Sequence, residues 1–142
     1  MPSSSRVVLD TNCLLVSISR YGEAYPVWRG FIDGRYTLCV STEILEEYEV
    51  VIGRLTTSEI ALNVIDAILK RKNVIRLDPY FHWNLITADP DDNKFVDCAF
   101  AANATFIVSD DTHFDVLSGV SFPKLQVLKL KEFLLALSEG IL

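Results

Sequence analysis

The sequence contains little that could build a disulfide framework, a zinc site or a membrane span. It has only two histidines, His82 and His113, and three scattered cysteines, an odd number without the spacing of zinc ligands. No apolar run approaches the roughly 18 residues of a transmembrane helix. The apolar run at 7–9 is too short for a signal peptide. We therefore expect a cytoplasmic protein without membrane contact, with reduced cysteines that serve in packing.

Positive charge is also scarce, with 13 lysines and arginines against 19 acidic residues and a net charge of −6. This balance argues against a protein that binds nucleic acid over its whole surface. A basic cluster of Lys70, Arg71, Lys72 and Arg76 is left as a candidate RNA contact, although most of this charge is typical of an ordinary surface. The sequence also lacks a glycine-rich phosphate loop and a Ser-His-Asp pattern.

What the sequence does contain is a regular alternation of short apolar runs and amphipathic segments. Strands are expected at 7–9, 36–40, 73–77, 105–108 and 125–128. Helices are expected at 13–20, 26–33, 42–53, 57–72, 92–103 and 130–138, with a short one after 112. This alternation predicts an α/β fold in which helices cover both faces of a mainly parallel sheet. The length of 142 residues favours one domain, residues 1–142.

Acidic residues are concentrated late in the chain, since seven of the eleven aspartates lie between Asp89 and Asp115. Asp10 follows the first expected strand, and Asp110 and Asp111 follow the strand at 105–108. The carboxyl ends of parallel strands are where ligands bind in such sheets, so these acids are expected to share one edge. Local roles remain open, because Asp10 could form an Asx turn and Asp110 or Asp111 could cap a short helix.

The helix that begins after Ser41 carries four glutamates, and its apolar residues fill one stripe. That stripe consists of Ile44, Leu45, Tyr48, Val51, Ile52 and Leu55. Glu47 lies at the edge of the stripe, whereas Glu43, Glu46 and Glu49 project away from it. Glu47 is therefore the glutamate expected to be half-buried, and the other three are expected to be solvated.

The segment after Pro90 gives a similar contrast. Asp89 is a natural N-cap for the helix that follows. Asp92 falls on the same side as Phe95, so it is expected to point toward the core, although it could also be one partner of a capping box. Asp97 falls nearly opposite and is expected to be solvated.

Asp10, Glu47, Asp92 and Asp111 would repel one another at a shared edge unless a cation lay between them. Mg²⁺ and Mn²⁺ prefer carboxylate oxygens and water. Such a site suits phosphodiester hydrolysis, because a metal lowers the pKa of bound water and stabilises the attacking and leaving oxygens. His113 is expected to be a partly exposed structural residue, with contact to a bound phosphate as the alternative.

Four segments, in order, resemble the blocks of the PIN domain family, over nearly the whole chain. They read VVLDTN at 7–12, STEILEE at 41–47, DPDDNKF at 89–95 and FIVSDD at 106–111. Each block alone is weak, but four in order on the expected elements are fairly specific. The amino-acid sequence of the third block is similar to that of toxins from toxin–antitoxin pairs.

The resemblance implies a three-layer α/β/α domain and an endoribonuclease that needs Mg²⁺ or Mn²⁺ and acts on single-stranded RNA. It further implies a homodimer that is silenced by a small antitoxin protein. The residues that match the family's acidic tetrad are Asp10, Glu47, Asp92 and Asp111. The residues that match supporting positions near the metal are Thr11, Asn12 and Ser109. Asp110 stands where relatives often carry glycine or asparagine, so either Asp110 or Asp111 could face the metal, and Asp111 is favoured.

Two other readings compete with a nuclease. The first is a catalytically silent PIN-like module that binds RNA or a protein, although such a module has no need of four converging acids. The second is another α/β protein with acids at the sheet edge. A phosphatase of the haloacid-dehalogenase type needs a second aspartate where this chain has Asn12. A response-regulator receiver pairs its acids before the first loop, where Asp10 stands alone.

Overall fold

The computed structural model describes residues 5–120 and 125–142. Its strands are β1 (Arg6–Leu9), β2 (Thr37–Val40), β3 (Val74–Arg76), β4 (Phe106–Val108) and β5 (Gln126–Leu128). Its α-helices are α1 (Thr11–Ser17), α2 (Tyr25–Ile32), α3 (Thr42–Leu55), α4 (Ser58–Lys70), α5 (Asn93–Ala101) and α6 (Leu130–Glu139). Two 3₁₀ segments, η1 (Pro90–Asp92) and η2 (Thr112–Gly119), complete the described elements.

The five strands form one parallel sheet in the order β3-β2-β1-β4-β5. The first strand of the chain is therefore the central one, and its Val7 is paired with Leu38 on β2 and with Phe106 on β4. Val7 and Val8 are fully buried, as expected for a strand covered on both faces. The predicted parallel α/β fold is confirmed.

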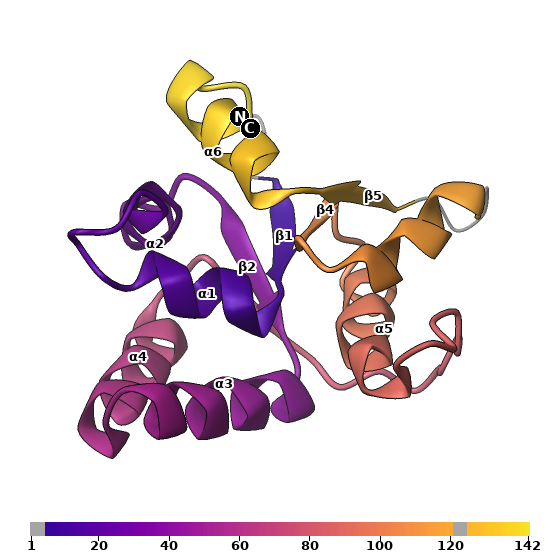
Figure 1. Cartoon of the computed structure of the whole chain (residues 1–142), viewed down its shortest axis with the longest axis horizontal. Helices are drawn as coiled ribbons and strands as arrows, with labels where there is room; N and C mark the ends of the chain where they lie inside the picture. Colours follow the sequence, from indigo (N-terminus) through magenta and orange to yellow (C-terminus); the bar gives the residue numbers. More distant parts are fainter. Residues whose placement is uncertain (1–4, 121–124) are drawn as a thin grey trace.

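Helices lie on both sides of this sheet (Figure 1). The connections from β1 to β2 and from β2 to β3 contain α1–α4, which lie along one face. The connection from β3 to β4 runs back across the sheet, so α5 packs on β1, β2 and β4 from the other face. Both α3 and α5 begin at the carboxyl edge of the sheet, and they contact each other there.

Two buried tyrosines join the helices to the sheet. The Tyr48 hydroxyl on α3 donates to the Leu9 carbonyl oxygen at 2.6 Å, and the Tyr36 hydroxyl donates to the Val27 carbonyl oxygen at 2.6 Å. Both side chains are fully buried. Since Leu9 is the last residue of β1, Tyr48 fixes the point at which the chain turns toward Asp10.

The expected helix at 92–103 is α5, which starts one residue later than predicted and ends at Ala101. The Asp89 side chain accepts a hydrogen bond from the Asp91 N–H, and a 3₁₀ turn follows before α5 starts at Asn93. The capping role expected of Asp89 is thus present, and the tight turn at Pro90 delays regular α-helical geometry by one turn. The three cysteines are free and buried, as predicted. No helix within the described ranges is long and apolar enough to cross a membrane.

Candidate metal centre

Asp10 lies between β1 and α1 and is held from two sides. Its Oδ2 accepts a hydrogen bond from Ser109 Oγ at 2.6 Å, and its Oδ1 accepts one from the Asn12 N–H at 3.3 Å. Burial raises the pKa of Asp10, although these two hydrogen bonds oppose the rise. The negative charges of Asp111 and Glu47 raise it further. The negative electrostatic potential around Asp10 thus favours the binding of a cation beside it.

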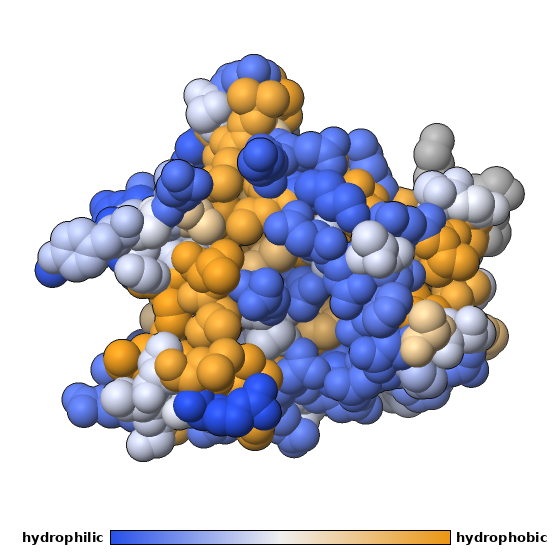
Figure 2. All heavy atoms as spheres, viewed as in Figure 1, coloured by the Kyte–Doolittle hydropathy of each residue, from blue (hydrophilic) through white to orange (hydrophobic). Residues whose placement is uncertain are grey.

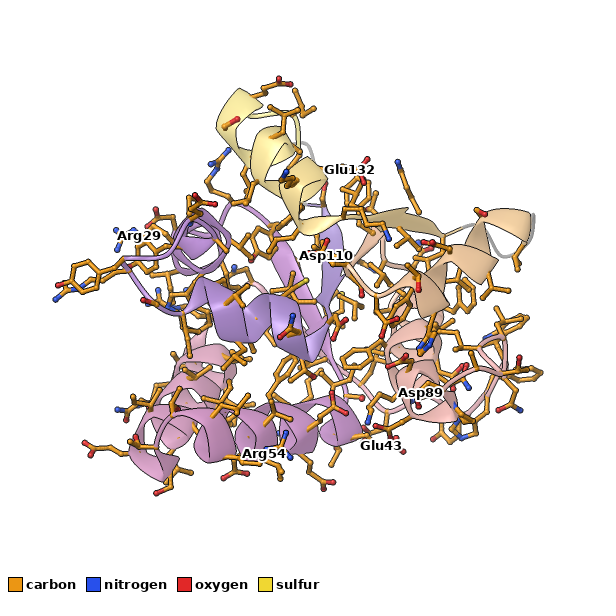
Figure 3. The ribbon with its side chains drawn as sticks, in the orientation of Figure 1. Arg29, Glu43, Arg54, Asp89, Asp110 and Glu132 are labelled. Atoms are coloured by element: carbon orange, nitrogen blue, oxygen red, sulfur yellow. The ribbon has the colours of Figure 1, made fainter. Side chains whose placement is uncertain are left out.

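The two acids after β4 point to different partners. Asp111 Oδ1 accepts a hydrogen bond from the His113 N–H at 2.9 Å, and the Asp111 N–H donates to Ser109 Oγ at 3.0 Å. Asp110 Oδ1 instead accepts from the Leu130 N–H at 2.9 Å, at the start of α6. Figure 3 shows Asp110 near this end of α6. Through Ser109, Asp111 shares a partner with Asp10, whereas Asp110 is engaged in holding α6.

Asp92 contacts His113, the histidine for which the sequence predicts a structural role. His113 Nδ1 lies 3.1 Å from Asp92 Oδ2 and 3.3 Å from Asp111 Oδ1. The hydrogen bond to Asp92 raises the pKa of His113. Burial raises the pKa of Asp92, the His113 hydrogen bond opposes this, and the charges of Asp89 and Asp111 add to the rise. Ligand atoms of Asp89, Asp92 and His113 all lie within 4.8 Å of one another.

Glu47 comes from α3 and is half-buried, as its helical position predicted, with 22% of its side chain exposed. Its Oε2 accepts a hydrogen bond from Thr11 Oγ1. Its Oε1 contacts Lys94 Nζ at 2.6 Å, and the same ammonium lies 3.0 Å from Asp91 Oδ1. Both carboxylate oxygens of Glu47 therefore have partners inside the protein.

Lys94 is a site residue that the sequence analysis missed. Its spacing from Asp91 (i, i+3) indicates a local ion pair. The contact with Glu47 could not be read from that spacing, because it joins α5 to α3. The predicted supporting residues do contact the acids: Thr11 bonds Glu47, Ser109 bonds Asp10, and Asn12 acts through its backbone N–H.

Asp97 is a correction to the sequence analysis. It is only 4% exposed rather than solvated. Its Oδ1 accepts a hydrogen bond from the Trp83 N–H at 3.0 Å, and its Oδ2 lies 3.1 Å from His82 Nδ1. The loop between β3 and η1 lies over this side of α5 and buries a face that the helical wheel assigns to solvent.

The residues of the basic cluster lie at opposite ends of the sheet's strands. Lys70, Arg71 and Lys72 precede β3, so they lie at the opposite end of the strands from the acids. Arg76 is the last residue of β3, so it lies at the carboxyl edge of the sheet. We call this the acidic edge, because Asp10, Glu47, Asp92 and Asp111 lie there. Figure 2 shows hydrophilic side chains gathered between α1 and α5, beside a more hydrophobic area over α1 and the adjoining parts of α3 and α4.

The donor set fits a hard divalent cation. Asp10, Asp92 and Asp111 supply carboxylate oxygens, which suit Mg²⁺ and Mn²⁺ better than softer metals. The raised pKa values of Asp10 and Asp92 indicate that the clustered charges are destabilised as the protein stands. A cation among them would relieve both burial and mutual repulsion.

A family model for the PIN domain matches residues 6–113. The chain belongs to the PIN domain family. The matched range contains Asp10, Glu47, Asp92 and Asp111, and members of this family are typically metal-dependent nucleases. No curated protein matches this chain with statistical significance.

Two solved structures share the fold. One is VapBC2 from Rickettsia felis bound to a DNA fragment from its promoter, with a TM-score of 0.59, 18% identity, and coverage of 87% of this chain and 98% of that chain. The other is the RRP44 PIN domain of T. brucei, with a TM-score of 0.54, 14% identity, and coverage of 98% and 84%. At these identities the comparison establishes only the shared architecture, which is that of a PIN domain.

Proposed function

We propose that this protein is an Mg²⁺- or Mn²⁺-dependent endoribonuclease that cleaves single-stranded RNA. The observation that carries the proposal is the meeting of Asp10, Asp92 and Asp111 at the carboxyl edge of the sheet, with burial and mutual repulsion raising the pKa of two of them. Asp10 follows β1, Asp92 ends η1 and Asp111 lies beyond β4. The capping hydrogen bonds that Asp10 and Asp111 accept do not require the three acids to meet. A site for a hard cation explains their arrangement.

In this proposal Asp10, Asp92 and Asp111 hold the cation, and Glu47 completes the acidic set from α3. A bound Mg²⁺ or Mn²⁺ would supply an activated water and neutralise the charge that develops on the phosphate. Ser109 orients Asp10 through its hydroxyl group. His113 holds Asp92 and Asp111 in place, and its ring is 38% exposed, so it can also reach a phosphate oxygen of a bound substrate.

The test is cleavage of a fluorogenic single-stranded RNA with Mn²⁺ or Mg²⁺, with wild type beside Asp92→Asn. Asp66→Asn is the matched control, because Asp66 is an exposed partner of Lys70 on α4, away from the acidic edge. Cleavage that needs metal, persists in Asp66→Asn and falls at least a hundredfold in Asp92→Asn is the expected result; that factor corresponds to about 3 kcal/mol of lost transition-state stabilisation. Calorimetry on the same samples measures Mn²⁺ binding.

Folded wild-type protein that neither cuts RNA nor binds Mn²⁺ would refute the nuclease. The acids would then be structural, and a silent PIN-like module that binds RNA or a protein would replace it. Mn²⁺ binding without cleavage of the first substrate would leave the metal centre standing and direct the search to other RNA sequences.

We further propose that the nuclease is the toxin of a toxin–antitoxin pair, is held in check by a small antitoxin protein, and forms a homodimer. Large apolar side chains on α1, α3 and α4 support a protein partner, since Val16, Leu55, Ile60 and Leu62 are all exposed. Induced expression should arrest growth of a bacterial host, and Asp92→Asn should abolish the arrest. Sedimentation of the purified chain tests the dimer.

A further inference from the structure

Lys94 contributes a fixed positive charge to the acidic edge. Among the described residues it is the only lysine or arginine with a nitrogen within 4.0 Å of Asp10, Glu47, Asp92 or Asp111. Its side chain is only 10% exposed, and its ammonium lies 5.8 Å from the centre of the Phe95 ring. The position of this charge is therefore set by packing as well as by its two acidic partners.

Glu47 is held at both of its oxygens. Thr11 donates to one oxygen, and the Lys94 ammonium lies 2.6 Å from the other. A divalent cation that used Glu47 as a ligand would have to displace the ammonium or lie beside it. Because like charges at that distance repel strongly, the two cations compete for the same carboxylate.

The other end of the acidic edge is arranged differently. Asp10, Asp92 and Asp111 receive hydrogen bonds from Ser109 and from His113, and no described lysine or arginine nitrogen lies within 4.0 Å of them. The edge thus has one part that is already neutralised, at Glu47, and one part that still lacks a compensating cation.

We propose that Lys94 is a positioning residue whose ammonium takes the place of a second metal ion at Glu47, so that each chain binds one divalent cation, on the side of Asp10, Asp92 and Asp111. This inference rests on the proposed metal-dependent nuclease and specifies its metal stoichiometry. It also predicts that Glu47 becomes a metal ligand once Lys94 is removed.

The test is to count and titrate Mn²⁺ by electron paramagnetic resonance and calorimetry. Wild type should bind one ion per chain. Lys94→Met keeps the length and apolar stem of the side chain, and it should bind a second ion or bind Mn²⁺ more tightly by on the order of tenfold to a hundredfold. Lys94→Arg should restore the wild-type result. Lys70→Met is the matched control, because Lys70 pairs with Asp66 on the distant helix α4.

The double variant Lys94→Met, Glu47→Gln assigns the gain to Glu47, because the extra binding should disappear in it. Gain that persists there would show that the extra binding does not use Glu47, and equal gain in Lys70→Met would show a general charge effect. Either outcome would overturn the inference. Two ions in wild type, or identical binding by wild type and Lys94→Met, would overturn it while the nuclease stands. Absence of Mn²⁺ binding from every variant would overturn both.

A second measurement does not depend on the folding of Lys94→Met. With Lys94 intact, Asp92→Asn should weaken Mn²⁺ binding at least tenfold more than Glu47→Gln does. Equal weakening by the two substitutions would make Glu47 a ligand of the first ion and overturn the inference.

Discussion

Replacing Tyr48 by phenylalanine removes one hydroxyl group from the core directly beneath the acidic edge. The ring stays in place, so no large cavity forms, but the Leu9 carbonyl loses a donor at 2.6 Å in a fully buried position. A buried acceptor left without its partner costs about 1–3 kcal/mol. The free energy of unfolding in urea should fall by that amount, and the melting temperature by about 3–10 °C.

Tyr36→Phe is the matched comparison, because the Tyr36 hydroxyl is equally buried and donates to the Val27 carbonyl at the same distance. Burial raises the pKa of both tyrosines, so both hydroxyls are donors throughout the neutral range. The two variants should lose similar stability. Only Tyr48→Phe frees the carbonyl that precedes Asp10, so only this variant should weaken Mn²⁺ binding, by about threefold to tenfold, which corresponds to roughly 1 kcal/mol.

Calorimetry at a temperature where both variants are fully folded separates the two effects. A stability change below about 0.3 kcal/mol in both variants would refute the reasoning about buried hydroxyls. Equal changes of Mn²⁺ affinity in both would refute the link between Tyr48 and the position of Asp10.

Three further predictions follow from other contacts. Asp97→Ala should lower the free energy of unfolding by about 2–3 kcal/mol in urea, because it removes the buried acceptor of the loop over α5. Asp78 caps α3 by accepting from the N–H and hydroxyl of Thr42, which lower the pKa of Asp78. Its contribution is present above the ordinary aspartate pKa of about 4 and is lost as pH falls through the lowered value, so urea midpoints of wild type and Asp78→Asn should differ at pH 6 and converge near pH 2. Asp110→Ala should lower stability by about 1 kcal/mol with little effect on Mn²⁺ affinity, whereas Asp111→Asn should weaken Mn²⁺ binding at least tenfold in calorimetry.

The structure could be predicted from the sequence where it depends on a local periodic pattern of apolar residues. The apolar stripe of α3 singled out Glu47, and the structure leaves it half-buried while Glu43, Glu46 and Glu49 are exposed. The alternation of strands and helices predicted the parallel sheet. The strand ends then placed Asp10 and Asp111 at one edge, because parallel strands end together.

The same reasoning failed where a partner comes from irregular backbone. Asp97 lies on the face of α5 that a helical wheel exposes, yet the loop with Trp83 covers it. The residues of that loop show no periodic pattern from which its path could be predicted. Lys94 and His113 are similar cases, because each contacts acids from other elements that only the folded chain brings near.

The central position of β1 has a consequence for synthesis. This strand is made first, but its neighbour β4 and the acid that follows β4 come from the last third of the chain. Pairing between segments so far apart in sequence is slow to form. Asp10 and Asp111 therefore come together only after the chain through residue 111 has been made and β4 has paired with β1. Under the proposed function, a site divided in this way cannot cut any RNA, the messenger that encodes it included, before β4 has paired with β1.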